Sequence, residues 1–259
     1  MALAQFTVTR RRPISGAESN TDNIGTVGKV GMPSVLITSA SRGLGFEFAR
    51  QYANDSWKVF AACRDPQASD RLQGLKSGEI RTLQMDVASS ESVHRAAAEI
   101  NDEAIDVLIN SAGIIGAPNQ TVGKVDYDSW AKVLNVNTMG PLRVIEAFTE
   151  HVARSSRKLI VTITSGMGSL ADNTSGGSIA YRSSKAAVNM VMRSAAIDLA
   201  PRGITCVLLN PGWVKTDMGG PNASITPADS VAALRRTIAG LRPAQSGKFF
   251  HYDGRPYDW

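Results

Sequence analysis

Short β-rich apolar runs alternate with helical patterns from Ser34 onward, and this alternation limits the folds open to the chain more than any other feature. The seven runs are SVLITSA, WKVFAACR, IRTLQMDV, IDVLINSAG, KLIVTITS, ITCVLLNPG and GKFFHYD. Apolar strands separated by helices are typical of a parallel sheet that is covered on both faces. The sequence therefore predicts an α/β fold with a seven-stranded parallel sheet.

Apolar residues recur at helical spacing between these runs. The spacing predicts helices over residues 44–54, 90–101, 127–155, 181–200 and 227–241. No stretch inside 34–259 has the composition of a linker, and no internal repeat is present. We therefore expect one doubly wound, Rossmann-type domain over 34–259, which binds its ligand beyond the carboxyl ends of the strands, at the switch point of the winding.

The first 33 residues differ in composition from the rest. They contain Arg10, Arg11 and Arg12 in succession and no acidic residue before Glu18, which resembles a mitochondrial presequence. A disordered basic tail is the alternative, so 1–33 is predicted to be a basic N-terminal extension.

Charge, hydropathy and cysteine content narrow the partners and the compartment. The net charge of +5 is not concentrated enough to predict a nucleic-acid surface, and no apolar run is long enough to predict a membrane span. Cys63 and Cys206 both lie in strand-like runs, which favours two buried thiols in a reducing compartment. We expect a cytoplasmic protein, with mitochondrial targeting as the alternative.

The stretch TSASRGLG, Thr38 to Gly45, lies where the first strand gives way to a helix. The loop N–H groups and the helix dipole point at one spot, which suits a phosphate. Glycine permits close approach of a pyrophosphate, and Ser39 stands where such a loop usually has its first glycine. The predicted nucleotide-binding residues are Ser39, Ser41, Arg42, Gly43, Leu44 and Gly45.

Polar or glycine-rich ends of neighbouring strands extend this site. The third strand ends at Asp86, and the fourth ends in Asn110, Ala112 and Gly113. Because the carboxyl ends of parallel strands meet at one edge of the sheet, these residues are predicted to bind the same cofactor.

The end of the second strand indicates which cofactor binds. Arg64 closes that strand, and Arg42 lies in the glycine loop. Two cations beside one pocket suit a 2′-phosphate, whereas an acid would hold a 2′-hydroxyl. We therefore predict NADP(H) in preference to NAD(H), with Asp65 as the alternative acid.

Tyr181 and Lys185 are four residues apart in a predicted helix, so they lie on one face. An ammonium near a phenol is expected to lower the phenol pKa, and a phenol tuned in this way can give a proton to a carbonyl oxygen. Ser165, at the end of the fifth strand, is placed to donate to the same oxygen. A surface Tyr and Lys pair without a catalytic role is the alternative.

These ordered motifs resemble those of the short-chain dehydrogenase/reductase family over residues 34–259. The matching residues are Thr38, Ser39, Gly43, Gly45, Asn110, Ser111, Ala112, Gly113, Asn137, Ser165, Tyr181, Lys185, Pro211, Gly212 and Thr216. Three further stretches, RQYANDSWKVFAACRDP, TDMGGPNASIT and GKFFHYDGRPYDW, are similar to the branch that contains sniffer-type carbonyl reductases and C-factor.

The resemblance implies a role for each matching residue. Asn137, Ser165, Tyr181 and Lys185 would form the catalytic tetrad. Tyr181 and Lys185 would also contact the nicotinamide half of the cofactor, Asp86 and Val87 would flank its adenine, and its nicotinamide end would lie against Pro211, Gly212, Val214 and Thr216. No metal is expected, because His94, His151 and His251 are isolated in the sequence.

Asn137 lies four residues before Pro141. Proline has no N–H to donate to the carbonyl four residues back, so that of Asn137 is predicted to be free in a helix that bends there. Our hypothesis is that this carbonyl holds a water that links Lys185 to solvent and restores the proton of Tyr181. A structural kink without a catalytic role is the alternative.

Two segments near the predicted site differ from the family pattern. The longer insert ADNTSGGS, 171–178, is expected to form a loop at the substrate mouth. Few residues separate Gly212 from the helix expected at Pro227. The segment that would cover the substrate is therefore expected to be short and the pocket to be open. An open pocket would accept small or flat carbonyl compounds.

The predicted function is reversible reduction of a small carbonyl compound by NADP(H). A signalling or sensor protein of C-factor type is the alternative, and an epimerase or dehydratase is a third reading. The resemblance implies a homodimer or homotetramer that pairs through the helices over 127–155 and 181–200; neither a nucleic acid nor a membrane is expected as partner.

Overall fold

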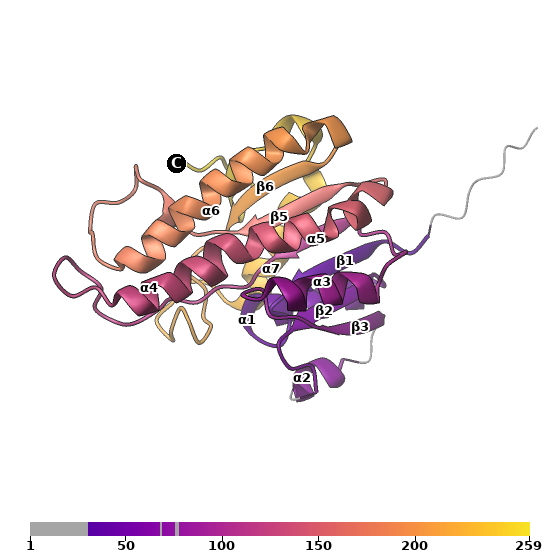
Figure 1. Cartoon of the computed structure of the whole chain (residues 1–259), viewed down its shortest axis with the longest axis horizontal. Helices are drawn as coiled ribbons and strands as arrows, with labels where there is room; N and C mark the ends of the chain where they lie inside the picture. Colours follow the sequence, from indigo (N-terminus) through magenta and orange to yellow (C-terminus); the bar gives the residue numbers. More distant parts are fainter. Residues whose placement is uncertain (1–30, 68, 76–77) are drawn as a thin grey trace, which may run out of the picture. The chain divides into compact units, whose positions relative to one another are not determined.

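The computed structural model describes residues 31–67, 69–75 and 78–259, of which Met32–Trp259 form one compact unit. Seven parallel strands make one sheet in the order β3-β2-β1-β4-β5-β6-β7 (Figure 1). They are β1 (Ser34–Thr38), β2 (Lys58–Cys63), β3 (Glu79–Gln84), β4 (Val107–Asn110), β5 (Leu159–Ile163), β6 (Thr205–Asn210) and β7 (Phe249–His251). The predicted seven-stranded parallel sheet is confirmed.

Helices cover both faces of the sheet and enclose two hydrophobic cores (Figure 1). One face packs against α3 (Ser90–Glu99), α5 (Gly140–Arg154) and α6 (Ile179–Asp198), and the other against α1 (Gly43–Asn54) and α7 (Pro227–Gly240). Alternate residues of β1 enter opposite cores: Leu36 faces the first group, and Val35 and Ile37 face the second. This is the doubly wound arrangement.

The winding reverses at β1. The strands β2 and β3 follow on one side of it, whereas β4 lies on its other side. The loops that leave β1 and β4 therefore diverge and open a crevice at the carboxyl edge of the sheet. Thr38 ties the two loops at the base of this crevice, since its Oγ1 accepts from the backbone N of Ser111 at 2.9 Å and of Ala112 at 3.0 Å.

The helix predicted over 127–155 is divided in the structure. It consists of α4 (Tyr127–Leu134), a π-helical turn over Asn135–Met139 and α5. The backbone N of Gly140 donates to the carbonyl of Asn135, five residues back. Pro141 cannot donate an N–H, so the α-helical pattern is broken here and the wider turn takes its place.

One short helix was not predicted from the sequence, and one predicted segment lies largely outside the described residues. The short helix α2 (Asp70–Gln73), capped by Ser69, was not predicted because four residues carry no detectable period. Apart from its last three residues, the N-terminal extension 1–33 lies outside the described residues. Within the part of the chain that the structure describes, no helix has the length and apolar character needed to cross a membrane.

Candidate active site

The glycine loop joins β1 to α1 at the crevice. Ser39 has φ 58° and Gly43 has φ 56°, both in the left-handed region. A Cβ on Gly45 would lie 2.2 Å from the carbonyl oxygen of Ser39, so only glycine permits this close turn. Helix α1 begins after Arg42 without a side-chain cap, which leaves the N–H groups of its first turn available to an anion.

Ser39→Gly should stabilise the protein, because Ser39 adopts a backbone conformation that L side chains disfavour. We expect a gain of about 0.5 to 1 kcal/mol in the free energy of unfolding, measured by urea denaturation. Ser41→Gly is the matched control: its φ is not positive, and it should lose about 0.5 to 1 kcal/mol. Equal losses in both variants would show that Ser39 is not strained.

Two adjoining cavities form a groove along the carboxyl edge of the sheet. Their volumes are about 490 Å³ and about 100 Å³, and Ser39, Arg42, Gly113 and Ile114 line both. The larger cavity is also lined by Gly43, Leu44, Gly45, Tyr181, Lys185, Pro211 and Thr216. The smaller one is also lined by Ser41, Cys63, Arg64, Asp86, Val87 and Ala112.

A tyrosine and a lysine line the larger cavity, and a serine interacts with the tyrosine. Tyr181 and Lys185 both project from α6, and the hydroxyl of Tyr181 is hydrogen-bonded to the side chain of Ser165. Lys185 Nζ donates to the carbonyl of Ile163 at 3.0 Å and lies 5.8 Å from the centre of the Tyr181 ring. The backbone N of Met167 donates to Ser165 Oγ at 3.1 Å, which leaves the serine's own proton to be donated to the oxygen of Tyr181.

Comparison with known protein families shows to which family the chain belongs. A family model of the short chain dehydrogenases matches residues 33–225. The chain belongs to this family. The resemblance expected from the motifs is therefore confirmed.

Individual relatives place this short-chain dehydrogenase more closely. C-signal of Myxococcus xanthus is 48% identical over 155 residues, which cover 60% of this chain and 93% of that protein. Carbonyl reductase Sniffer of D. melanogaster has a TM-score of 0.83 at 32% identity, over 88% of this chain and all of that one. NADPH-bound carbonyl reductase from chicken fatty liver has a TM-score of 0.81 at 32% identity, over 88% and 99%.

In this dehydrogenase, burial changes the pKa values of Tyr181 and Lys185 more than the contact between the two residues does. Desolvation raises the pKa of Tyr181, and the hydrogen bond with Ser165 opposes this. Desolvation also lowers the pKa of Lys185 to about 8. The expectation that the Lys185 ammonium lowers the phenol pKa is not met here: both groups are buried, and the loss of hydration has the larger effect.

Lys185→Met should change how the stability of the protein depends on pH. The pKa of Lys185 is about 8 in the folded protein, against an ordinary value of 10.5. Between these values the unfolded chain binds the additional proton, so this group makes the free energy of unfolding rise with pH, by at most about 1.4 kcal/mol per pH unit. Wild type should gain stability relative to Lys185→Met as the pH rises from 8 to 10, in urea denaturation series. Parallel curves would contradict the shifted pKa.

Asn137 lies inside the π-helical turn and is 1% exposed. Its amide bridges two elements: Oδ1 accepts from the N of Ile114 at 2.8 Å, and Nδ2 donates to the carbonyl of Ile114 at 2.8 Å and to Ser184 Oγ at 3.0 Å. The side chain therefore fixes the loop after β4 against α6. Sequence reasoning considered only the backbone carbonyl and missed this role.

Three of the predicted cofactor residues do not line the groove. Asn110 is 2% exposed, and its Nδ2 donates to Thr162 Oγ1 at 3.4 Å and to the carbonyl of Pro141 at 3.5 Å. Gly212 packs against Tyr252, and Val214 is buried.

The alternative acid and the two neighbouring loops also have defined positions. Asp65 accepts from the backbone N of Gln67 at 3.1 Å and does not line the groove. The insert 171–178 lies against the C-terminal segment, as Ala171 N donates to the carbonyl of Trp259 at 3.0 Å, and it does not line the larger cavity. The expectation of a loop at the substrate mouth is therefore not met.

Sequence reasoning missed several side chains that line the larger cavity. Ile114, Ile115 and Met218 give it apolar walls, and Asp217 lies 3.7 Å from Arg42 in an exposed ion pair. Ile114 and Ile115 directly follow the predicted Gly113, and Met218 follows the predicted Thr216 by two residues. Proximity to a motif was the only signal that the sequence offered for them.

Proposed function

We propose that this protein is an NADPH-dependent carbonyl reductase that also oxidises alcohols in the reverse direction. The observation that carries the proposal is that Tyr181 and Lys185 line one groove with the glycine loop, and that Ser165 is hydrogen-bonded to Tyr181. Two structural neighbours of this chain are carbonyl reductases, one of them with bound NADPH, which supports the same conclusion.

The groove fits a dinucleotide phosphate. The uncapped start of α1 and the close turn at Gly45 offer N–H groups to a pyrophosphate, and Arg42 and Arg64 line the smaller cavity. A Cβ on Gly113 would lie 3.5 Å from Asn137 Oδ1 and 3.7 Å from Lys185 Nζ, so the backbone there faces polar groups. The glycine loop would hold the pyrophosphate and the two arginines a 2′-phosphate.

The chemistry of the reacting oxygen follows from the side chains of the larger cavity. A bound nicotinamide supplies or accepts the hydride. Tyr181 donates its phenolic proton to the carbonyl oxygen of the substrate, and Ser165 donates a hydrogen bond to the same oxygen. Lys185, held by the carbonyl of Ile163, places a positive charge beside the phenolate that remains. A water on the carbonyl of Asn137 would then return a proton through Lys185.

The walls of the cavity suggest the class of substrate. Ile114, Ile115 and Met218 give the cavity apolar walls. A bound cofactor would take part of its volume of about 490 Å³, which leaves space for a small organic molecule. We infer that small aldehydes, ketones and diketones with an apolar body are the substrates.

A substrate panel tests the proposal. Purified protein is incubated with aldehydes, ketones and diketones, and the loss of NADPH absorbance is compared with that of NADH. We expect reduction of several small carbonyl compounds, with NADPH preferred. Activity confined to a single bulky sterol would contradict the proposed cavity. No reduction of any carbonyl, with NADPH still bound, would favour a sensor.

A nucleotide-binding signalling protein of C-factor type is the second candidate. It is favoured by the 48% identity with C-signal, the highest among the relatives described above. Such a protein needs the groove but has no need of a Ser165 and Tyr181 pair. The two candidates therefore differ in what the loss of the Tyr181 hydroxyl does.

We further propose a homodimer or homotetramer that pairs through α5, α6 and the turn between α4 and α5. Met139, Leu142, Met190 and Ile197 are large apolar side chains exposed on these elements. Light scattering on purified protein tests the assembly. Two free, buried cysteines are compatible with a reducing compartment, and we propose a cytoplasmic location, with the basic 1–33 segment as the reason to test mitochondrial import.

A further inference from the structure

The segment after β7 folds back along this last strand. Phe250 and Pro256 form an antiparallel bridge, His251 N donates to the carbonyl of Arg255 at 2.8 Å, and Tyr257 N donates to that of Phe249 at 2.9 Å. This return runs antiparallel to β7 at the edge of the sheet and places the side chain of Tyr257 against the turn that follows β5.

Tyr257 is the residue of this segment that reaches the site. Its ring packs on Phe249, with centroids 4.8 Å apart, and is stacked with His251. Its hydroxyl donates to Asp172 Oδ2 at 2.5 Å. Burial and then the neighbouring Asp172 carboxylate raise the pKa of Tyr257 to about 12, so the phenol stays protonated as a donor at neutral pH.

The Tyr257 hydroxyl also lies directly against the turn that carries Ser165. A Cβ on Gly166 would lie 2.4 Å from Tyr257 Oη and 3.1 Å from its Cζ. Gly166 is the first residue of the short 3₁₀ turn Gly166–Gly168, for which Ser165 is the N-cap. The phenol end of Tyr257 therefore covers this turn at van der Waals distance.

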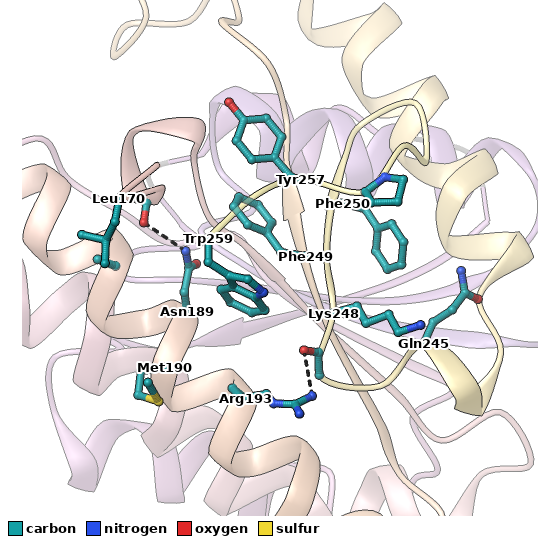
Figure 2. Close-up of a pocket in the computed structure, with 14 residues that line it drawn as sticks. Leu170, Asn189, Met190, Arg193, Gln245, Lys248, Phe249, Phe250, Tyr257 and Trp259 are labelled. Carbon is teal, nitrogen blue, oxygen red and sulfur yellow. Dashed lines mark hydrogen bonds between the residues drawn. The ribbon is translucent and has the colours of Figure 1, made fainter. Parts of the chain in front are cut away.

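Helix α6 holds the same turn from the other direction. A Cβ on Gly168 would lie 2.8 Å from the backbone carbon of Lys185, and Asn189 Nδ2 donates to the carbonyl of Gly168 at 3.3 Å. Figure 2 shows this hydrogen bond, with the rings of Tyr257 and Trp259 on the neighbouring C-terminal segment and that of Phe249 on β7. The turn is thus enclosed between α6, which carries Tyr181, and the C-terminal segment.

We propose that Tyr257 and Asp172 form a positioning pair that holds the Gly166–Gly168 turn against α6 and so fixes the hydroxyl of Ser165 beside that of Tyr181. The pair joins two segments 85 residues apart in the sequence. Asp172 lies in the insert 171–178, which follows the turn directly. The insert then serves to anchor the turn. This proposal rests on the proposed reductase function for its kinetic consequences, but its structural consequence is independent of activity.

Tyr257→Phe and Asp172→Ala test the pair. Each variant removes the hydrogen bond and keeps the rest of the segment. Because a small displacement of a reacting group is costly, we expect the kcat for carbonyl reduction to fall about tenfold in each, with the KM for NADPH unchanged. The double variant should be no worse than the single ones, since all three lack the same bond.

Two readouts separate positioning from a general loss of stability. Burial raises the pKa of Tyr181, and this rise is opposed by the hydrogen bond with Ser165. Loosening it raises that pKa, so the basic limb of the reduction profile should move to higher pH. Hydrogen exchange of the amides of Met167 and Gly168, which donate to Ser165 Oγ and to its carbonyl, should speed up.

Tyr127→Phe is the matched control, because Tyr127 is 72% exposed on α4 and lies outside the site. It should leave kcat and the exchange rates unchanged. If Tyr257→Phe and Asp172→Ala behave like this control in both readouts, the proposal is wrong. The wild-type protein could reduce no carbonyl compound while the variants still show faster hydrogen exchange at Met167 and Gly168. That result would support the positioning pair and contradict the proposed reductase function.

A substitution that creates a clash between residue 166 and Tyr257, and a second one that relieves it, give an independent test of the proposal. Gly166→Ala places a methyl group 2.4 Å from Tyr257 Oη, so it should displace the turn and lower kcat. Combining Gly166→Ala with Tyr257→Phe removes the atom that clashes most, and the remaining 3.1 Å contact with Cζ needs a shift of only a few tenths of an ångström. The double variant should recover part of the kcat lost by Gly166→Ala. No recovery would contradict the contact on which the proposal depends.

Discussion

Tyr181→Phe should abolish most of the turnover while leaving the cofactor bound. The change removes only the hydroxyl, whose hydrogen-bond partner is Ser165. General acid catalysis is worth ~10² to 10⁴ in rate, and we expect a fall of about this size in the kcat for carbonyl reduction. The affinity for NADPH, measured by the change in its fluorescence on binding, should stay the same because the glycine loop is untouched.

The same variant separates the two candidate functions. A reductase that depends on proton transfer loses its biological output together with its turnover, whereas a sensor keeps its output with the cofactor bound. A Tyr181→Phe protein that reduces carbonyl compounds at the wild-type rate would show that another group supplies the proton. A variant that also loses NADPH affinity would indicate that the hydroxyl holds the cofactor, a separate role from acid catalysis.

Gly45→Ala should disrupt the nucleotide end of the groove. The new methyl carbon would lie 2.2 Å from the Ser39 carbonyl oxygen and 2.7 Å from its carbon, so the backbone of the loop has to move. Forcing a group into a packed site costs about 1 to 3 kcal/mol, and we expect this loss in the free energy of unfolding. Because the loop N–H groups move with the backbone, the Kd for NADPH should rise by about tenfold or more, corresponding to about 1.4 kcal/mol.

Gly240→Ala is the matched control for this change. Gly240 ends α7, and a Cβ there meets no atom within 4 Å. The control should unfold at the same urea concentration as wild type or a higher one, since alanine favours a helix over glycine by about 1 kcal/mol. If Gly45→Ala matches this control in both stability and NADPH affinity, the close turn at Ser39 is not needed for binding.

The features that were predicted from sequence are those imposed by the backbone. The seven strands, the glycine loop and the four-residue spacing of Tyr181 and Lys185 follow from local periods and from the need for glycine at Gly45. Asp86 and Gly113 line one groove, as expected for residues that follow the carboxyl ends of strands in the same parallel sheet.

The features that were missed depend on tertiary packing. The pKa shifts of Tyr181 and Lys185 depend on how completely the surrounding elements exclude water, which no spacing encodes. The contact of Tyr257 with Gly166 joins the C-terminal segment to a turn in the middle of the sequence. Asn110 was predicted to touch the cofactor because it ends a strand, but its amide is used inside the core.

The π-helical turn over Asn135–Met139 has a consequence for how this chain tolerates insertions and deletions. Such a turn contains one more residue than an α-helical turn, and each residue rotates a helix by about 100°. Deleting one residue there would turn Val144 and Phe148, both fully buried on α5, away from the sheet. The length of this turn is therefore fixed, and a one-residue deletion should damage the core as well as the position of Asn137.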